Sequence, residues 1–161
     1  MRLQALKGVQ LAIRASVASG LSIAIAEVLK LEHPIYAFVA AVIVTDLTPS
    51  QTRQLGLRRM VATVLGAVCG AILSQIFPPG AWAVGLSVLI AMLICQVLRA
   101  SEGARVAGYI CAIVVLDHSA EPWLYAFNRF VETALGVGVA WLISCVPKLI
   151  QLEEVALNEP K

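Results

Sequence analysis

Two arginine–threonine pairs are the side chains of this sequence best suited to binding a ligand. The pattern R-x-x-x-T-x-L-G begins at Arg59 and again at Arg129. A guanidinium keeps its charge and can bind a carboxylate or a phosphate through two parallel hydrogen bonds. The threonine of each pattern, Thr63 or Thr133, lies one helical turn further on and adds a hydroxyl donor for the same anion. We predict an anion-binding pair, with one arginine at each mouth of a single pathway.

The arginines also have a simpler interpretation. Arg58 and Arg59 could be surface charges that fix the orientation of the chain and extend toward lipid headgroups, and for Arg58 we favour this interpretation. Arg129 does not fit it, because Arg129 falls on the side predicted to be poor in positive charge. Glu132 follows Arg129 by three residues, so the two could form an ion pair on one helix face. That pair would be structural, or it would hold an acid that a bound carboxylate displaces.

Further titratable groups lie near the ends of apolar segments. Asp46 and Asp117 each end a short apolar run, and together with Glu27 and His118 they could relay protons. Two interpretations of the aspartates stand side by side: they face a cavity from the ends of broken helices, or they lie at the water interface. For His118, a solvated position in a loop is the more ordinary interpretation.

The sequence contains no motif for nucleotide, zinc-protease or hydrolase chemistry. The patterns G-x-x-x-x-G-K-[ST], H-E-x-x-H, G-x-S-x-G and G-x-G-x-x-G are absent. The four cysteines lie in apolar runs without C-x-x-C spacing, which favours packing over a disulfide or a zinc site: Cys69, Cys95, Cys111 and Cys145. We therefore predict no catalytic residue, no cofactor, no metal ion and no nucleic-acid partner.

Long apolar segments must position these groups. Hydrophobic residues make up 60% of the chain, charged residues 14%, and the mean hydropathy is +0.86, which indicates a membrane protein. A helix needs about 20 apolar residues to cross a hydrocarbon core of roughly 30 Å. We expect an all-α integral membrane fold with six transmembrane helices, at about residues 9–29, 34–47, 57–77, 81–98, 104–117 and 127–146. The second and fifth are short. The capping-box pattern TPSQ predicts that the third helix begins early, at Pro49.

The basic residues predict the orientation of the chain. With the N-terminus in the cytoplasm, ten of the twelve lysines and arginines fall on the inner side, and only Lys30 and Arg129 fall outside. This distribution follows the positive-inside rule for six spans with both termini in the cytoplasm. The first segment is a poor signal peptide, because it carries Arg14 and lacks a typical cleavage site. We predict a multi-pass protein of the inner, or plasma, membrane.

The sequence contains an internal repeat. EVLK recurs as QVLR, AAVIVTD recurs as CAIVVLD, and the arginine–threonine motif recurs, at offsets of 69, 71 and 70 residues. Each half holds three segments, an odd number, so the second half must enter the membrane from the opposite side. Inverted repeats are common in transporters, whose substrate sites lie near the repeat interface.

The repeat predicts the domain organisation. We expect one transmembrane domain over residues 1–161, with a first repeat at about 9–77, a second repeat at about 81–146, and a short cytoplasmic tail at 147–161. Small residues recur at every fourth position and predict seams of close helix packing: Gly8, Ala12, Ser16, Gly20 and Ala24; Ala62, Gly66, Gly70 and Ser74; Gly136, Ala140 and Ser144. Six short spans make a thin wall for a pore, so we also expect a homo-oligomer, most simply a dimer.

The run YAFVAAVIVTDLTPSQTRQLGLRRMVATVLGAVCGAIL, residues 36–73, resembles the core of the fusaric-acid-resistance and aromatic-acid-exporter superfamily. In that superfamily an apolar span ending near a proline precedes a basic loop and an R-x-x-G-T-x-x-G-type helix. Plant aluminium-activated malate channels are more distantly similar. Ala62 stands where the family usually has glycine, and the 161 residues contain no counterpart of the large cytosolic domain that many such proteins carry.

The resemblance implies a function. It implies export or channel-like passage of organic anions, especially aromatic carboxylates, across an inner membrane, either passive or coupled to protons. Arg59 with Thr63, and by repeat symmetry Arg129 with Thr133, would then line the route. Two alternatives from other classes stand beside it: a membrane scaffold or subunit of a larger complex that transports nothing, and a membrane-embedded enzyme acting on lipid or an isoprenoid.

Overall fold

The computed structural model describes residues 2–98, 100–117 and 121–146. These residues form six α-helices and one short 3₁₀ turn, which confirms the all-helical prediction. The helices are α1 (Arg2–Val28), α2 (Pro34–Val44), α3 (Pro49–Ile76), α4 (Ala81–Val97), α5 (Ala104–Asp117) and α6 (Pro122–Cys145), with the 3₁₀ turn η1 at Ser101–Gly103. The predicted tail at 147–161 lies outside the described residues.

Prolines mark the starts of three helices. Pro34, Pro49 and Pro122 occupy the first positions of α2, α3 and α6, where the missing N–H is not needed and the fixed φ suits a helix. Helix α3 therefore begins where the sequence predicted. Thr48 is its N-cap but makes no side-chain capping hydrogen bond, so the expected capping box does not form.

Three of the described helices are long and apolar enough to cross a membrane. They are the Lys7–Val28 part of α1, α3 with 28 residues, and α6 with 24 residues. Helices α2, α4 and α5 have 11, 17 and 14 residues, below the roughly 20 that a full crossing needs. The short second and fifth segments are thus confirmed, and the fourth is also shorter than a full span. The chain is a multi-pass membrane protein.

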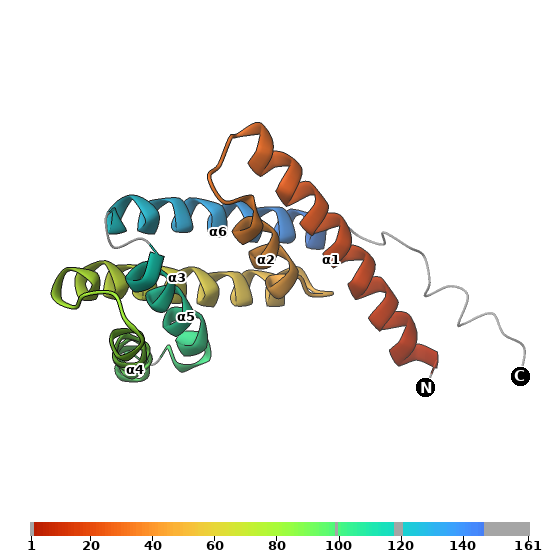
Figure 1. Ribbon diagram of the computed structural model, residues 1–161. Coiled ribbons are helices and arrows are strands. Elements are labelled where there is room, and N and C mark those ends of the chain that lie inside the picture. Colours follow the sequence, from red (N-terminus) through yellow and green to blue (C-terminus); the bar gives the residue numbers. More distant parts are fainter. Residues whose placement is uncertain (1, 99, 118–120, 147–161) are drawn as a thin grey trace, which may run out of the picture.

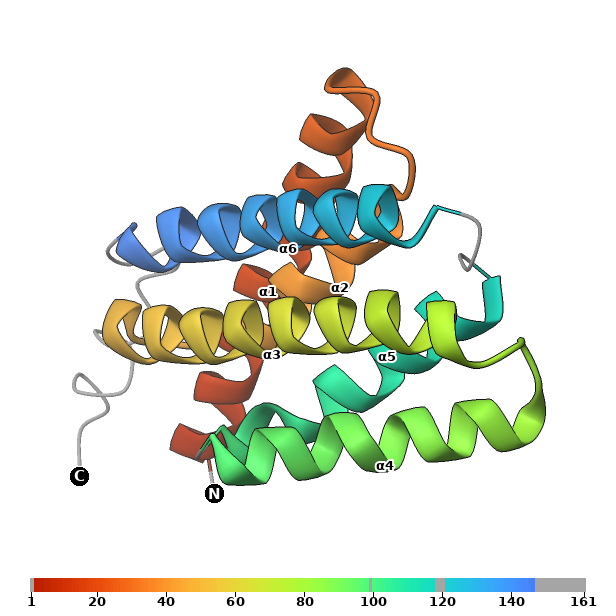
Figure 2. The ribbon, with the colours of Figure 1, turned by 90° about the vertical axis from the view of Figure 1, so that its left-hand side faces the viewer.

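Helices α3 and α6 lie side by side and antiparallel, and the other helices pack around this pair (Figure 2). Helix α5 packs against α3, and α2 packs against α6. Helix α4 covers α5, while α1 runs obliquely across α2 and α6 (Figure 1). Each short helix, α2 or α5, therefore contacts the long helix that belongs to the other half of the sequence.

Glycines allow the short helices to approach the long ones. A methyl group on Gly66 of α3 would overlap the backbone of Ala107 in α5, and one on Gly136 of α6 would overlap the backbone of Ala37 in α2. The seams predicted in α3 and α6 are therefore contacts within the chain. The seam predicted in α1 differs, because all five of its small residues are exposed.

The described part of the chain buries small side chains and exposes large apolar ones. Its three core clusters consist mainly of alanine with some valine and cysteine. Many valines, leucines and isoleucines on the outer faces of the long helices are exposed, among them Val61, Val68 and Leu142. This distribution suits helices whose surroundings are lipid chains rather than water. All four cysteines are free: Cys95 and Cys111 are buried, as the packing interpretation expects, Cys69 is half-buried, and Cys145 is exposed, so Cys145 does not fit that interpretation.

Candidate anion site

Arg59 is buried between α3 and α5 with most of its donors unpaired. Its side chain is 6% exposed, and its Nη2 donates a hydrogen bond to the hydroxyl of Tyr109 at 3.1 Å. Its Nε and Nη1 are buried and have no hydrogen-bond partner among the described residues, and the same holds for the hydroxyl of Thr63. Thr63 lies one turn further along α3 and is 1% exposed. Two buried side chains on one helix face thus hold unused donors beside a fixed positive charge.

Arg129 is buried between α6 and α2 in a more aromatic setting. It is 2% exposed, and its Nε donates to the hydroxyl of Tyr125 at 2.5 Å. Its guanidinium lies over the ring of Tyr36 in α2, an arrangement that favours a cation. Nη2 of Arg129 has no hydrogen-bond partner among the described residues. Thr133, one turn on, is also buried.

Glu132 is fully buried in the same region as Arg129. Its Oε1 accepts a hydrogen bond from the backbone N–H of His33 at 2.9 Å, while its Oε2 has no hydrogen-bond partner among the described residues. The ion pair predicted between Arg129 and Glu132 does not form, because Arg129 turns to two tyrosines and Glu132 turns to the chain before α2. A buried carboxylate and guanidinium that do not pair directly are costly to bury.

The two arginine environments differ in their acids. In the first motif, Ala62 occupies the position that Glu132 occupies in the second, and Ala62 packs against Gly103. Glu102, in the turn before α5, forms an ion pair with Arg58, the neighbour of Arg59 in the sequence, and both are exposed. No ion pair joins Arg59 to an acid in the described part of the chain, whereas the Arg129 environment contains the buried Glu132.

The two arginines lie inside their helices rather than at the helix ends. Arg59 is about 15 Å along α3 from its first residue, and Arg129 is about 10 Å along α6, at 1.5 Å per residue. They contact different short helices, since Arg59 bonds to Tyr109 of α5 and Arg129 lies over Tyr36 of α2. Their placement at opposite mouths of one pathway stays a prediction.

The other predicted acids lie away from the arginines. Helix α2 ends at Val44, so Asp46 lies in the following loop, where its Oδ1 accepts a hydrogen bond from the N–H of Thr48 at 3.3 Å. Asp117 is exposed at the end of α5, and Glu27 is exposed near the end of α1. His118 lies outside the described residues. The structure thus gives Asp46 a local role in closing the turn before α3.

Sequence reasoning missed the tyrosines and Arg14. Tyr125 precedes Arg129 by one helical turn, a spacing that could have indicated their contact, but no local pattern links Tyr109 to Arg59. Arg14, predicted only as an inner-side charge, is 5% exposed and donates to the carbonyl oxygens of Leu47 at 2.7 Å and Val146 at 3.3 Å. It ties α1 to the chain ends that follow α2 and α6.

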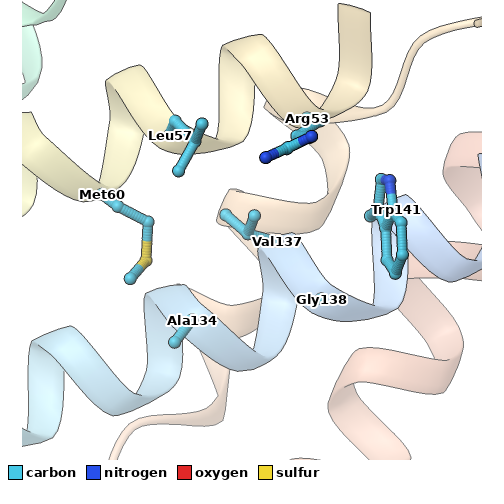
Figure 3. A pocket seen from close by; sticks show the side chains of 7 residues that line it. All are labelled: Arg53, Leu57, Met60, Ala134, Val137, Gly138 and Trp141. Carbon is cyan, nitrogen blue, oxygen red and sulfur yellow. The ribbon is translucent and has the colours of Figure 1, made fainter. Parts of the chain in front are cut away.

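A groove of about 530 Å³ runs between α3 and α6 on a face separate from the Arg59 contact with α5. We call it the α3–α6 groove, and its lining residues are Arg53, Leu57, Met60, Ala134, Val137, Gly138 and Trp141 (Figure 3). Arg53 is the charged member of this set. The groove was not predicted from the sequence, because it depends on how two distant helices are paired.

Comparison with known proteins agrees with the membrane fold and the resemblance noted in the sequence. A UPF0421 protein of Staphylococcus haemolyticus is 28% identical to the chain over 131 residues, 78% of this chain. A UPF0421 protein of Staphylococcus epidermidis is 29% identical over 137 residues, 80% of this chain. The chain spans about two-fifths of the length of these relatives, 40% and 41%. No solved structure matches the chain significantly. The family model described as "Aromatic acid exporter family member 1" matches residues 8–146, nearly the whole of the described chain, and on this match the chain belongs to the aromatic acid exporter family.

Proposed function

We propose that the chain forms a passage for organic anions, in particular aromatic carboxylates, that leave the cell across the plasma membrane. The observation that carries this proposal is the set of unused donors on Arg59 and Thr63, buried in a membrane helix with no ion pair to an acid among the residues that the structure describes. Polar groups within membrane spans are costly and mark pathways for ions and polar substrates. A carboxylate would accept hydrogen bonds from both side chains.

In this proposal the second motif has a related but distinct role. Arg129 and Thr133 line the same route, and Glu132 provides a buried carboxylate in the same region. Asp46 and Asp117 lie near the ends of the route, and transport is either passive or coupled to protons. Tyr36 and Tyr125 surround Arg129 with aromatic rings, a setting that would suit an aromatic acid.

The proposed route lies between two inverted repeats. Two matched contacts support this arrangement: Gly66 with Ala107 and Gly136 with Ala37 are the same pair of positions, 70 residues apart in the sequence. The packing of α5 on α3 and of α2 on α6 has the same relation. The charge distribution favours both termini in the cytoplasm.

We further propose that the protein acts as a homodimer. Helix α1 carries an exposed face of small residues from Gly8 to Ala24, and a second helix can approach such a face closely in lipid. A dimer would thicken the wall around a route that three long and three short helices enclose only in part. We do not assign catalysis to the chain, because an exporter needs binding and release rather than bond cleavage.

Anion flux into liposomes that contain only this protein tests the proposal. We expect flux of benzoate above that of empty liposomes, and a marked decrease in Arg59→Gln and Arg129→Gln. Arg58→Gln is the matched control, since Arg58 is exposed and paired with Glu102 on the surface. Folding of each variant is checked by its elution in detergent. No flux above empty liposomes from well-folded protein would favour the scaffold alternative.

A further inference from the structure

The α3–α6 groove is a second place where an anion with a ring would fit. Its lining combines one guanidinium, one indole and five apolar or small residues. The volume of about 530 Å³ lies within the 300–1,000 Å³ range of small-molecule sites. Such a lining can hold an apolar ring and one negative charge at the same time.

The floor of the groove is open because of a glycine. A Cβ built on Gly138 of α6 would meet no atom within 4 Å, in contrast to Gly56, whose Cβ would collide with Val137 across the helix pair. The two helices therefore touch closely at Gly56 and leave space above Gly138. Leu57 of α3 and Trp141 of α6 stand at the sides of this space (Figure 3).

Arg53 supplies an unused positive charge at one end of the groove. No hydrogen bond or ion pair joins its side chain to another residue that the structure describes. It lies in the second turn of α3, where the positive end of the helix dipole also favours an anion. Charge complementarity at this end and the indole of Trp141 at the side favour a carboxylate attached to a flat ring over a purely apolar occupant.

We propose that the α3–α6 groove binds an aromatic carboxylate, with the carboxylate on Arg53 and the ring over Gly138 beside Trp141. The choice of ligand rests on the proposed function. The site itself is separate from Arg59 and Arg129, which lie on the faces of α3 and α6 turned to the short helices. In a transport cycle it would collect the substrate from one membrane surface before the buried arginines receive it.

Fluorescence of Trp141 tests this site without measuring transport. Replacing Trp82 and Trp123, both exposed, with phenylalanine leaves Trp141 as the one tryptophan of the chain. The full chain in nanodiscs of zwitterionic lipid is titrated with benzoate and with its neutral analogue benzamide. We expect saturable quenching by benzoate. Benzamide should bind at least about tenfold more weakly, because the hydrogen bonds to a charged group are lost.

Three variants decide whether the groove is responsible. Arg53→Gln should weaken benzoate binding about tenfold or more. Gly138→Leu should abolish binding by filling the open space, and because a side chain there meets no neighbour, the fold should be preserved. Arg58→Gln is the matched control on the same helix and should leave binding unchanged, since Arg58 pairs with Glu102 outside the groove.

Several results would overturn the site. Equal affinity for benzamide and benzoate, quenching that never saturates, or an equal loss in Arg58→Gln would each reject it. Quenching that disappears in nanodiscs of anionic lipid would show that a lipid headgroup occupies the groove instead. Disulfide-linked dimers of Gly138→Cys would show that a second copy covers it. Saturable binding without any liposome flux would keep the site and reject the transport function, whereas flux without binding would reject the site alone.

Discussion

Valine in place of Thr63 or Thr52 gives a matched pair of variants in one helix. Both threonines are buried in α3, at 1% and 0% exposure, but only Thr52 uses its hydroxyl. The Thr52 Oγ1 accepts from the N–H of Asp46 at 3.0 Å and shares a hydrogen bond with the hydroxyl of Ser144 at 2.8 Å. The Thr63 hydroxyl has no partner among the described residues. The same substitution should therefore change stability in opposite directions.

The magnitudes follow from the hydrogen bonds. Thr52→Val leaves the half-buried N–H of Asp46 without its acceptor, removes the bond to the Ser144 hydroxyl, and should lower the free energy of unfolding by about 1–3 kcal/mol. Thr63→Val removes a buried hydroxyl that bonds to nothing and should raise the free energy of unfolding by about 1 kcal/mol. If that hydroxyl is kept for an anion, the same variant should reduce benzoate flux about tenfold or more, because a hydrogen bond to a charged group is worth about 1.5–3 kcal/mol.

Unfolding titrations in mixed detergent micelles and liposome flux measure the two effects on the same preparations. A stabilised Thr63→Val protein with reduced flux would identify Thr63 as a residue retained for binding at the expense of stability. Equal destabilisation of Thr63→Val and Thr52→Val would refute the reasoning, because it would mean that the Thr63 hydroxyl has a structural partner. Unchanged flux in a stabilised Thr63→Val protein would refute its role in the route.

Three further predictions concern packing and buried charge. Gly66→Ala and Gly136→Ala should each lower the free energy of unfolding by about 1–3 kcal/mol, because the added methyl overlaps a helix backbone. Gly138→Ala should raise the free energy of unfolding by about 0.5–1 kcal/mol. The same unfolding titration compares all three, and equal effects would contradict the described packing. Arg14→Met should lower the free energy of unfolding by about 2 kcal/mol or more, since two partly buried hydrogen bonds from a charged group are lost, and wild-type stability would show that those bonds are not made. Glu132→Gln should keep the bond from the His33 N–H and unfold no more easily than wild type, whereas Glu132→Ala should have a clearly lower free energy of unfolding. A Glu132→Gln protein less stable than Glu132→Ala would indicate a charge that the fold requires.

Much of the fold could be predicted because its signals are local. Prolines at 34, 49 and 122 fix helix starts by removing an N–H that only the first turn can spare. The apolar runs gave the number of helices, and the shortness of α2 and α5 was visible in their sequences. The end of α2 was placed three residues too late, at 47 instead of Val44, because the apolar Leu47 extends the run in the sequence while the chain leaves the helix at Thr45 and turns to meet α3.

The site was predicted only in part, because its partners come from distant segments. Both arginine–threonine pairs are buried, but the contact of Arg59 with Tyr109 joins residues 50 apart, and that of Arg14 with Val146 joins residues 132 apart. The local rule that a residue pairs with one three positions away predicted a bond between Arg129 and Glu132. That bond does not form: the N–H of His33, before α2, donates to Glu132, while Arg129 lies over the ring of Tyr36 in α2.

The most direct test of the central claim is a measured distance between a bound carboxylate and the buried guanidinium. Solid-state NMR on protein with ¹⁵N-labelled arginine and benzoate labelled with ¹³C at the carboxyl carbon reports their dipolar coupling in lipid. An Arg53→Gln background removes any signal from the α3–α6 groove. The account predicts a coupling that persists in Arg58→Gln and falls sharply in Arg59→Gln. A coupling that is absent from the start, or that survives the loss of Arg59 unchanged, would contradict it.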